Sequence, residues 1–198
     1  MKPVTLEQLQ LAVTARGYRW FDSGDFNLNL IGIRASDLQS NAFNDLICVA
    51  FMQAGQWILL QFDATTDPGI YYRENPADEQ GTGFLVEGQH TGAFRIGMHK
   101  GYKALVQARA LSVYRDDDRD AVLEADASKI DHGWHGCNMH RASEHRESVQ
   151  VDRWSAMCQV IADPLEFDLL MSVVDLAADQ WGNHFTYTLL SERDLPGV

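Results

Sequence analysis

Apolar residues recur at helical spacing near both ends of the chain. The range 5–16 begins with a candidate capping box, in which the side chains of Thr5 and Gln8 each bind the other residue's backbone amide. Gly17 follows the range and is expected to end the helix. The range 164–181 follows Asp163, a favourable N-cap, and carries a longer apolar face. That face consists of Leu165, Leu169, Leu170, Val173, Val174, Leu176, Ala177 and Trp181. We therefore expect an N-terminal and a C-terminal helix.

Between these helices the pattern changes to alternation and short apolar runs, which are typical of strands. Alternation begins at Phe26, and runs at 48–51 and 57–62 flank Gly55, which predicts a hairpin. Further strands are expected at 83–89 and 93–97 around a turn, and at 102–107, 110–114 and 185–190. Residues 121–162 predict mostly loop and short strand. The expected fold is α+β and β-rich, with one domain over residues 1–198.

The composition narrows the class of protein. The chain is 45% hydrophobic and 22% charged, which suits an ordinary folded core. The formal net charge of −12 argues against a nucleic-acid partner, because phosphates favour basic surfaces. No run is long enough for a membrane span, and the N-terminus lacks the apolar segment of a signal peptide, so we expect synthesis in the cytoplasm.

The charge run at 115–120 predicts a solvated loop. Asp116, Asp118 and Asp120 have the spacing that opens a calcium-binding loop. However, Ala121 stands where such a loop needs glycine, and Ala127 stands where it needs glutamate. We therefore expect no metal here and no cofactor elsewhere.

Reactive side chains concentrate between residues 132 and 158. The three cysteines of the chain are odd in number and irregular in spacing, so reduced thiols are expected. Cys158 follows His140 by eighteen positions, and a neighbouring imidazole can convert a thiol to the nucleophilic thiolate. The small Ser155 and Ala156 would let a substrate backbone approach, and the amides of Met157 and Cys158 could form an oxyanion hole. The alternative is a buried cysteine that only packs.

This segment resembles the active-site signature of the L,D-transpeptidase (YkuD-like) family, a His followed by fourteen to seventeen residues and Ser/Thr-x-Gly-Cys. Here His140 is followed by fourteen residues and then by Ser155-Ala156-Met157-Cys158. The likeness is closer to a divergent phage and bacterial branch with Asn-Ile-His-Arg and Trp/Tyr-Ser-Ala-Gly-Cys-Gln-Val. Upstream matches are the segments 65–69, 88–89, 97–99, 102–107 and 114–116, so the likeness spans about residues 60–162.

The resemblance implies a mixed β-sandwich and a cysteine acyl-enzyme that acts on peptidoglycan stem peptides. Cys158 would attack the carbonyl, His140 would carry the proton, and the main-chain carbonyl of Arg141 would orient His140. The substrate cleft would include His99, Trp154, Ser155 and Gln159.

Two departures from the family pattern bear on the reaction. Met157 replaces the usual glycine before the nucleophile, where glycine often supplies an unusual backbone angle. Gln159 and Val160 follow Cys158 where the transpeptidases usually carry a carboxylate-binding arginine, which favours hydrolysis over cross-linking. The missing charge could come from Arg95, Arg141 or Arg153.

Three other functions remain open. The chain could cross-link stem peptides as a transpeptidase, or it could bind the cell wall without catalysis. A zinc peptidase could use His132, His135, Cys137, His140 and His145, although no HExxH motif is present. Because peptidoglycan lies outside the cytoplasm, a hydrolase would reach it through lysis, a virion or a secretion system.

Overall fold

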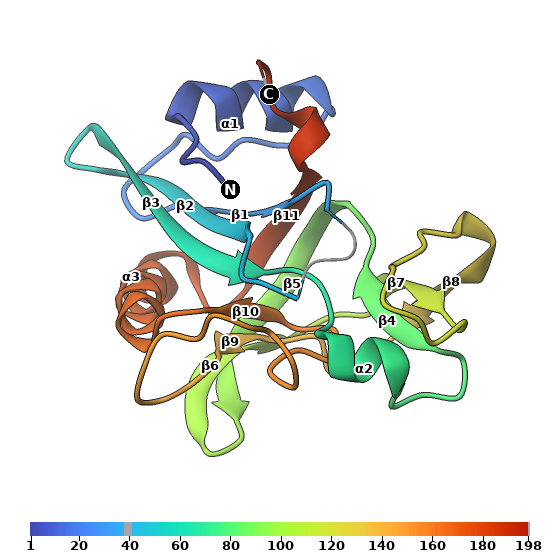
Figure 1. Cartoon of the computed structure of the whole chain (residues 1–198). Helices are drawn as coiled ribbons and strands as arrows, with labels where there is room; N and C mark the ends of the chain where they lie inside the picture. Colours follow the sequence, from blue (N-terminus) through green and yellow to red (C-terminus); the bar gives the residue numbers. More distant parts are fainter. Residues whose placement is uncertain (38–40, 198) are drawn as a thin grey trace.

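The computed structural model describes residues 1–37 and 41–197, and its centre is a closed β-barrel (Figure 1). The strand order around the barrel is β1-β11-β5-β6-β9-β10-β3-β2. The strands are β1 (Asn29–Arg34), β2 (Asp45–Gln53), β3 (Gln56–Thr65), β5 (Gly88–His99), β6 (Tyr102–Gln107), β9 (Met139–Arg141), β10 (Gln159–Ile161) and β11 (Phe185–Ser191). The pairs β1–β11 and β9–β10 are parallel and the other pairs are antiparallel.

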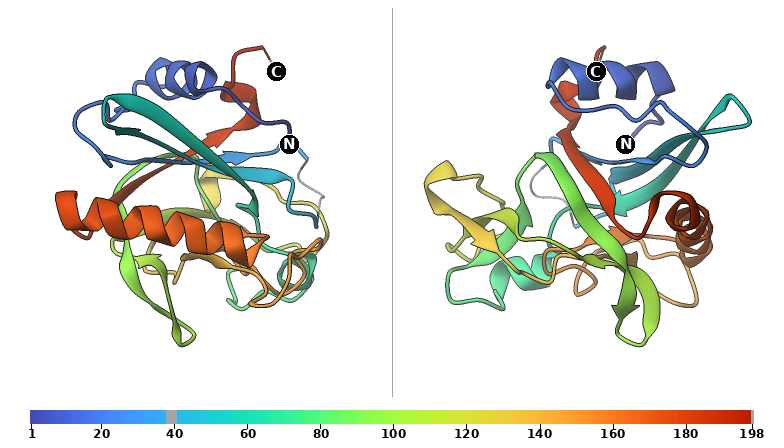
Figure 2. Two further views of the ribbon diagram at one scale, coloured as in Figure 1. Left: turned by 90° about the vertical axis from the view of Figure 1, so that its left-hand side faces the viewer. Right: turned by 180° about the vertical axis from the view of Figure 1, so that it is seen from behind.

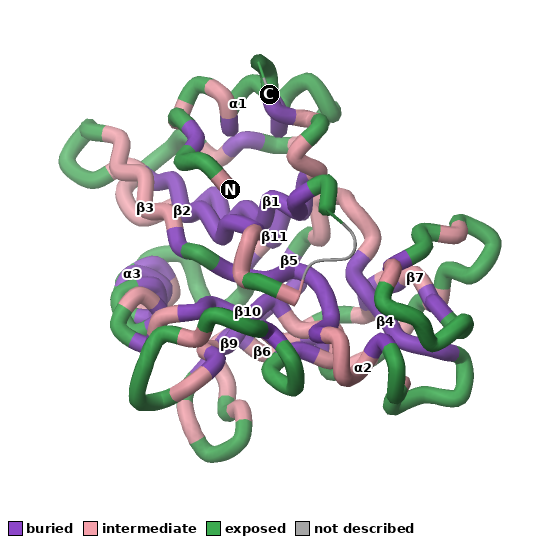
Figure 3. The backbone as a smooth tube through the Cα atoms, viewed as in Figure 1, coloured by how far each residue is buried: buried purple, intermediate pink, exposed green. Residues whose placement is uncertain are grey.

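The strand-rich α+β class is confirmed, but the main sheet closes into a barrel, whereas the family resemblance implied a mixed β-sandwich. Strands β1, β2 and β11 complete the barrel, and they lie outside the range 60–162 in which the family likeness was found. The core therefore depends on both ends of the chain. Figure 3 shows the barrel strands as mostly buried and the connecting loops as mostly exposed.

Two tight hairpins shape the barrel. The predicted turn between β2 and β3 is confirmed: Ala54 and Gly55 have φ values of 51° and 76°, as a type I′ turn requires. Lys100 and Gly101 make the same kind of turn between β5 and β6, with φ values of 47° and 90°. The second hairpin brings His99 next to Tyr102.

A separate three-stranded sheet has the order β4-β7-β8, with β4 (Thr82–Leu85), β7 (Leu111–Asp116) and β8 (Ile130–Gly133). The turn predicted between 83–89 and 93–97 is wrong, because β4 pairs with β7 while residues 88–99 form one barrel strand. The solvated loop predicted at 115–120 is also wrong at its start. Arg115 and Asp116 are buried at the end of β7. The buried guanidinium of Arg115 forms an ion pair with Asp131.

Helix α1 (Leu6–Ala15) covers the outer face of β1, β2 and β11, at the top of Figure 1. Its capping box forms as predicted. Because α1 covers one face of β1 and the barrel core covers the other, every residue of β1 is buried. The strand starts at Asn29 and not at Phe26, whose φ of 54° interrupts extended backbone.

Helix α3 (Pro164–Trp181) has the predicted bounds and the predicted Asp163 cap, and it lies along the side of the barrel (Figure 2). Its predicted apolar face is partly wrong. The exposed members are Leu165, Leu169, Leu176 and Trp181, and the buried face adds Phe167 and Met171. The apolar face of α3 is wider than the surface that packs against the barrel, so several of its apolar side chains stay exposed.

Residues 70–74 form a short helix, α2 (Ile70–Glu74), that the pattern did not indicate. Two 3-10 turns, at Ala127–Lys129 and Glu192–Asp194, complete the structure. Among the described residues, no helix is long and apolar enough to cross a membrane.

Candidate active site

His140 lies on the short strand β9, and Cys158 lies at the start of the adjacent short strand β10, one residue before it. Strands β9 and β10 are parallel, with Met139 opposite Gln159 and His140 opposite Val160. Cys158 immediately precedes β10, and the amide of Gln159 donates to the carbonyl oxygen of Asn138 over 2.8 Å. Because side chains alternate along strands, Met139 and Gln159 point into the barrel, and His140 and Cys158 project from the opposite face.

His140 is held as a neutral base. Its ring is almost fully buried, and Nδ1 donates to the carbonyl oxygen of Arg141 over 2.7 Å. This bond fixes the proton on Nδ1 and leaves the lone pair of Nε2 free. Burial, partly offset by the Arg141 contact, lowers the pKa of His140 to about 4. The ring is therefore uncharged at neutral pH and can accept a proton.

The thiol of Cys158 is half-buried and weakly hydrogen-bonded. The backbone amide of Asn138 donates to Sγ over 3.5 Å, and Sγ lies 3.6 Å from the carbonyl oxygen of Gly136. Burial raises the pKa of the thiol, while the Asn138 amide and Lys100 oppose that rise. Cys158 is therefore a protonated thiol in this structure. Among the hydrogen bonds of the described residues, none joins Cys158 to His140. Such catalytic contacts often tighten only when substrate binds.

Two backbone amides near the thiol are candidates for an oxyanion hole. Within the part of the chain that the structure describes, the N–H groups of Met157 and Cys158 have no protein acceptor. The loop that carries them is fixed, because the Ser155 hydroxyl donates to the carbonyl oxygen of Cys158 over 2.8 Å and Gly69 donates to that of Ser155 over 2.9 Å. Met157 does not adopt a positive φ, so its backbone does not need the glycine found in the family signature.

A pocket of about 240 Å³ opens beside Cys158. Arg115 and the exposed indole of Trp134 line it, and neither was identified from the sequence. Arg115 is nearly buried and is 2.8 Å from Asp131 and 3.4 Å from Asp78. No local pattern reveals this position, because Arg115 belongs to a charge run that resembles a solvated loop.

Several residues expected in the substrate cleft lie elsewhere. The side chain of Gln159 is fully buried in the barrel, where it accepts a hydrogen bond from the Tyr187 hydroxyl over 2.7 Å. Ser155 is also fully buried, and its role in this structure is to hold the Cys158 loop. Trp154 is exposed but lines separate surface hollows. In this structure neither the Gln159 nor the Ser155 side chain is exposed on the surface of the pocket.

The three arginines proposed to replace the missing charge do not line the pocket beside Cys158. The Arg141 guanidinium lies 4.1 Å from the centroid of the Tyr102 ring, and that of Arg153 lies 3.8 Å from the centroid of Tyr71. Arg95 is an exposed residue of β5. Arg115 is the arginine that the structure places in this pocket.

The histidines and cysteine considered as zinc ligands have separate partners. His132 contacts the Ser112 hydroxyl, His135 contacts the carbonyl oxygen of Leu111, and Cys137 is buried in the barrel core. No group of three or more His, Cys, Asp or Glu side chains among the described residues is arranged to hold a metal ion.

The Met157 side chain narrows the pocket on the side of β4. A Cβ atom on Gly83 would lie only 2.4 Å from the terminal methyl of Met157, so the two residues are in close contact. Replacing Met157 by alanine should widen the pocket on the side of β4. We expect the labelling of Cys158 by a bulky maleimide, relative to its labelling by iodoacetamide, to rise several-fold. An unchanged ratio, measured by mass spectrometry, would show that Met157 does not limit access.

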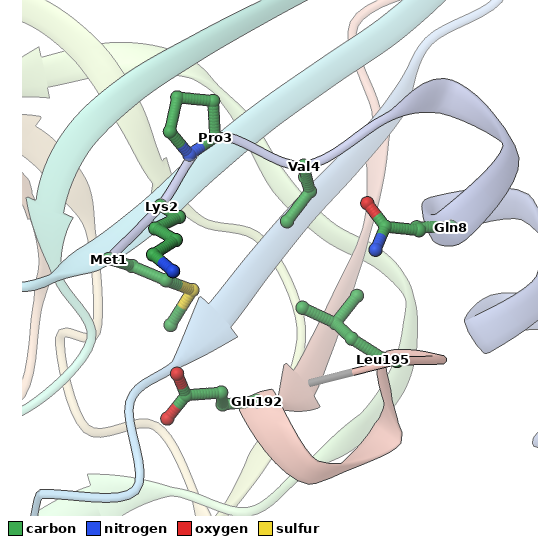
Figure 4. A pocket seen from close by; sticks show the side chains of 8 residues that line it. Met1, Lys2, Pro3, Val4, Gln8, Glu192 and Leu195 are labelled. Carbon is green, nitrogen blue, oxygen red and sulfur yellow. The ribbon is translucent and has the colours of Figure 1, made fainter.

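Another hollow of about 330 Å³ lies between the two chain ends (Figure 4). It is lined by Met1, Lys2, Pro3, Val4, Gln8, Glu192, Leu195 and Gly197. This set holds no thiol, so the pocket beside Cys158, whose lining includes His135 but not His140, remains the candidate active site.

Comparison of the chain with family models, with curated proteins and with solved structures found no match in any of the three.

Proposed function

We propose that this protein is a cysteine-dependent hydrolase of peptidoglycan stem peptides, with a divergent form of the L,D-transpeptidase (YkuD-like) fold. The observation that carries the proposal is the arrangement around Cys158: a half-buried thiol beside two free backbone amides, with a neutral imidazole on the adjacent strand. Nucleophile, base and oxyanion donors are the three parts that acyl transfer requires.

The reaction begins when Nε2 of His140 takes the proton of the Cys158 thiol. The sulfur then attacks the carbonyl carbon of the scissile amide, and the oxyanion is stabilised by the amides of Met157 and Cys158. His140 returns the proton to the leaving nitrogen as the C–N bond breaks, which leaves a thioester on Cys158. Water, deprotonated by His140, attacks the thioester and releases the acid and the thiol.

The substrate class rests on the resemblance of the His140 and Cys158 segments to the family signature. Hydrolysis is favoured over cross-linking, because the position that usually supplies the carboxylate-binding arginine is occupied here by other residues. Access to the cell wall would come through lysis, a virion or a secretion system.

The pH dependence follows from the state of His140. Its pKa of about 4 lies below the ordinary value of 6.5, so the base-competent neutral form is present above pH 4. We expect the acid limb of the kcat/KM profile to have its midpoint near pH 4. A midpoint near 6.5 would show that His140 is not the buried base described above.

The proposed function is tested by incubating the protein with defined muropeptide monomers and dimers and determining the masses of the products. Shortened stems indicate a carboxypeptidase, and dimers converted to monomers indicate an endopeptidase; either outcome supports hydrolysis. New dimers would indicate a transpeptidase and would contradict the proposal that water is the acyl acceptor. Unchanged muropeptides would contradict the proposed substrate class.

A further inference from the structure

His99 lies flat against the candidate base. The imidazole rings of His99 and His140 are stacked, with centroids 4.2 Å apart and planes inclined by 13°. Tyr102, across the β5–β6 hairpin, meets the edge of the same His99 ring at 5.7 Å. Because β5 contributes His99 and β9 contributes His140, the stack joins two strands that are separated by β6 in the barrel.

The hydrogen bonds of Asn138 fix the tautomer of His99. The Asn138 side-chain oxygen accepts from the backbone amide of Gln107 over 2.9 Å, so the other side-chain atom is the NH₂ group. That group lies 3.2 Å from Nδ1 of His99 and must donate to it. Nδ1 therefore carries no proton, and the proton of the neutral His99 ring is on Nε2. His140 has the opposite tautomer.

These contacts keep His99 uncharged. A second proton on His99 would sit on Nδ1 and face the Asn138 NH₂ group, donor against donor. Nε2 is buried and has no protein partner among the described residues, so no carboxylate balances a charge there. Burial and the nearby Lys100 both lower the pKa of His99.

Lys100 opposes a positive charge on either ring, and the nearby Glu144 carboxylate is paired with Arg141 at 3.3 Å. Lys100 lies on the same hairpin, Arg141 follows His140 on β9, and the Tyr102 hydroxyl contacts the carbonyl oxygen of Arg141. Cys158 immediately precedes β10, and Phe167 of α3 packs against Tyr102. A charged His99 would therefore add repulsion directly over His140.

Asn138 also connects His99 to the nucleophile. Its side chain holds the His99 ring, and its backbone amide donates to Sγ of Cys158. Asn138 therefore contacts both the Cys158 thiol and the His99 ring.

We propose that His99 is a positioning residue, whose neutral ring covers His140, fixes its plane and keeps water away from it. This inference rests on the proposed function, because it assigns His99 a role through the candidate base. It differs from the expected substrate contact, since a positioning residue should change kcat and the pH profile while leaving KM nearly unchanged.

The test compares wild type with the variants His99→Ala and His99→Phe. For each protein, the rate at which iodoacetamide alkylates Cys158 is measured between pH 3 and pH 9. The values of kcat and KM are measured on the muropeptide that wild type cleaves. In His99→Ala we expect the rate at pH 7 to fall by about 10- to 100-fold, because His140 loses its fixed plane. The acid limb should move from about 4 toward 6.5, because water reaches the ring. His99→Phe keeps a ring over His140 and should restore most of the rate and the low acid limb.

Exposed His145 supplies the matched control, and His145→Ala should match wild type in every measurement. Near-ultraviolet circular dichroism verifies that each variant is folded. The positioning role is overturned if His99→Ala alkylates at the wild-type rate, if its only effect is a higher KM, or if His99→Phe is as slow as His99→Ala. Failure of the proposed function is distinguishable, because His140→Ala would then alkylate Cys158 as fast as wild type.

Discussion

Replacing Cys158 by alanine is expected to abolish cleavage of stem peptides, with kcat/KM lowered by roughly 10⁴-fold or more, as for other removed nucleophiles. No other thiol can take its place, because Cys48 and Cys137 are fully buried and burial raises the pKa of both thiols. The measurement is a time course of muropeptide products read by mass spectrometry.

Cys48→Ala is the matched control. Cys48 lies on β2 beneath α1, away from the pocket, and its removal should leave the rate at the wild-type level. His140→Ala should lower the rate by about 10²- to 10⁴-fold, the usual contribution of a general base. If Cys158→Ala retains wild-type cleavage, the nucleophile lies elsewhere and the mechanism is wrong.

Replacing Arg34 by methionine is expected to destabilise the fold by about 3–5 kcal/mol, the usual cost of leaving a buried carboxylate without its partner. The Arg34 side chain is 3% exposed, and its Nε lies 2.7 Å from Asp67, which is itself nearly buried. The guanidinium also pairs with Glu87 and donates to the carbonyl oxygen of Thr66. Methionine fills similar space but leaves these acceptors unpaired.

Urea unfolding followed by circular dichroism measures this effect. The control is Lys103→Met, which removes the ion pair between Lys103 and Asp175, both of them substantially exposed. Exposed pairs contribute about 0–1 kcal/mol, so this variant should unfold close to wild type. Equal midpoints for the Arg34 and Lys103 variants would contradict a structural role for the buried network.

The sequence predicts elements well where the signals are local. The capping residues Thr5 and Asp163 mark the starts of α1 and α3, and Gly55 marks the β2–β3 turn. Each of these signals acts within a few residues. The closure of the barrel has no such signal, because it depends on β1 and β11 meeting across more than 150 residues of chain.

Strands β9 and β10 are three residues each, too short for a period to be recognised. Their parallel pairing is set by β6 on one side and β3 on the other. The structure places His140 on β9 and Cys158 immediately before the neighbouring strand β10.

The rest of the site could not be predicted, because its members meet only through tertiary contacts. Arg115 is buried because Asp131, sixteen residues later, pairs with it. His99 lies against His140 because β5 and β9 are both neighbours of β6 in the barrel. Gln159 follows the nucleophile in sequence, yet alternation along β10 turns its side chain into the barrel.

The central claim, that Cys158 is an acyl-forming nucleophile activated by His140, is tested most directly with a carbapenem. Attack of the thiol on the lactam carbonyl opens the C–N bond of the ring, so the protein gains the full mass of the drug. We expect one adduct, mapped to Cys158 by peptide mass spectrometry, in wild type and in Cys48→Ala, and a much slower adduct in His140→Ala. An adduct on another residue, or one that forms equally fast without His140, would contradict the account.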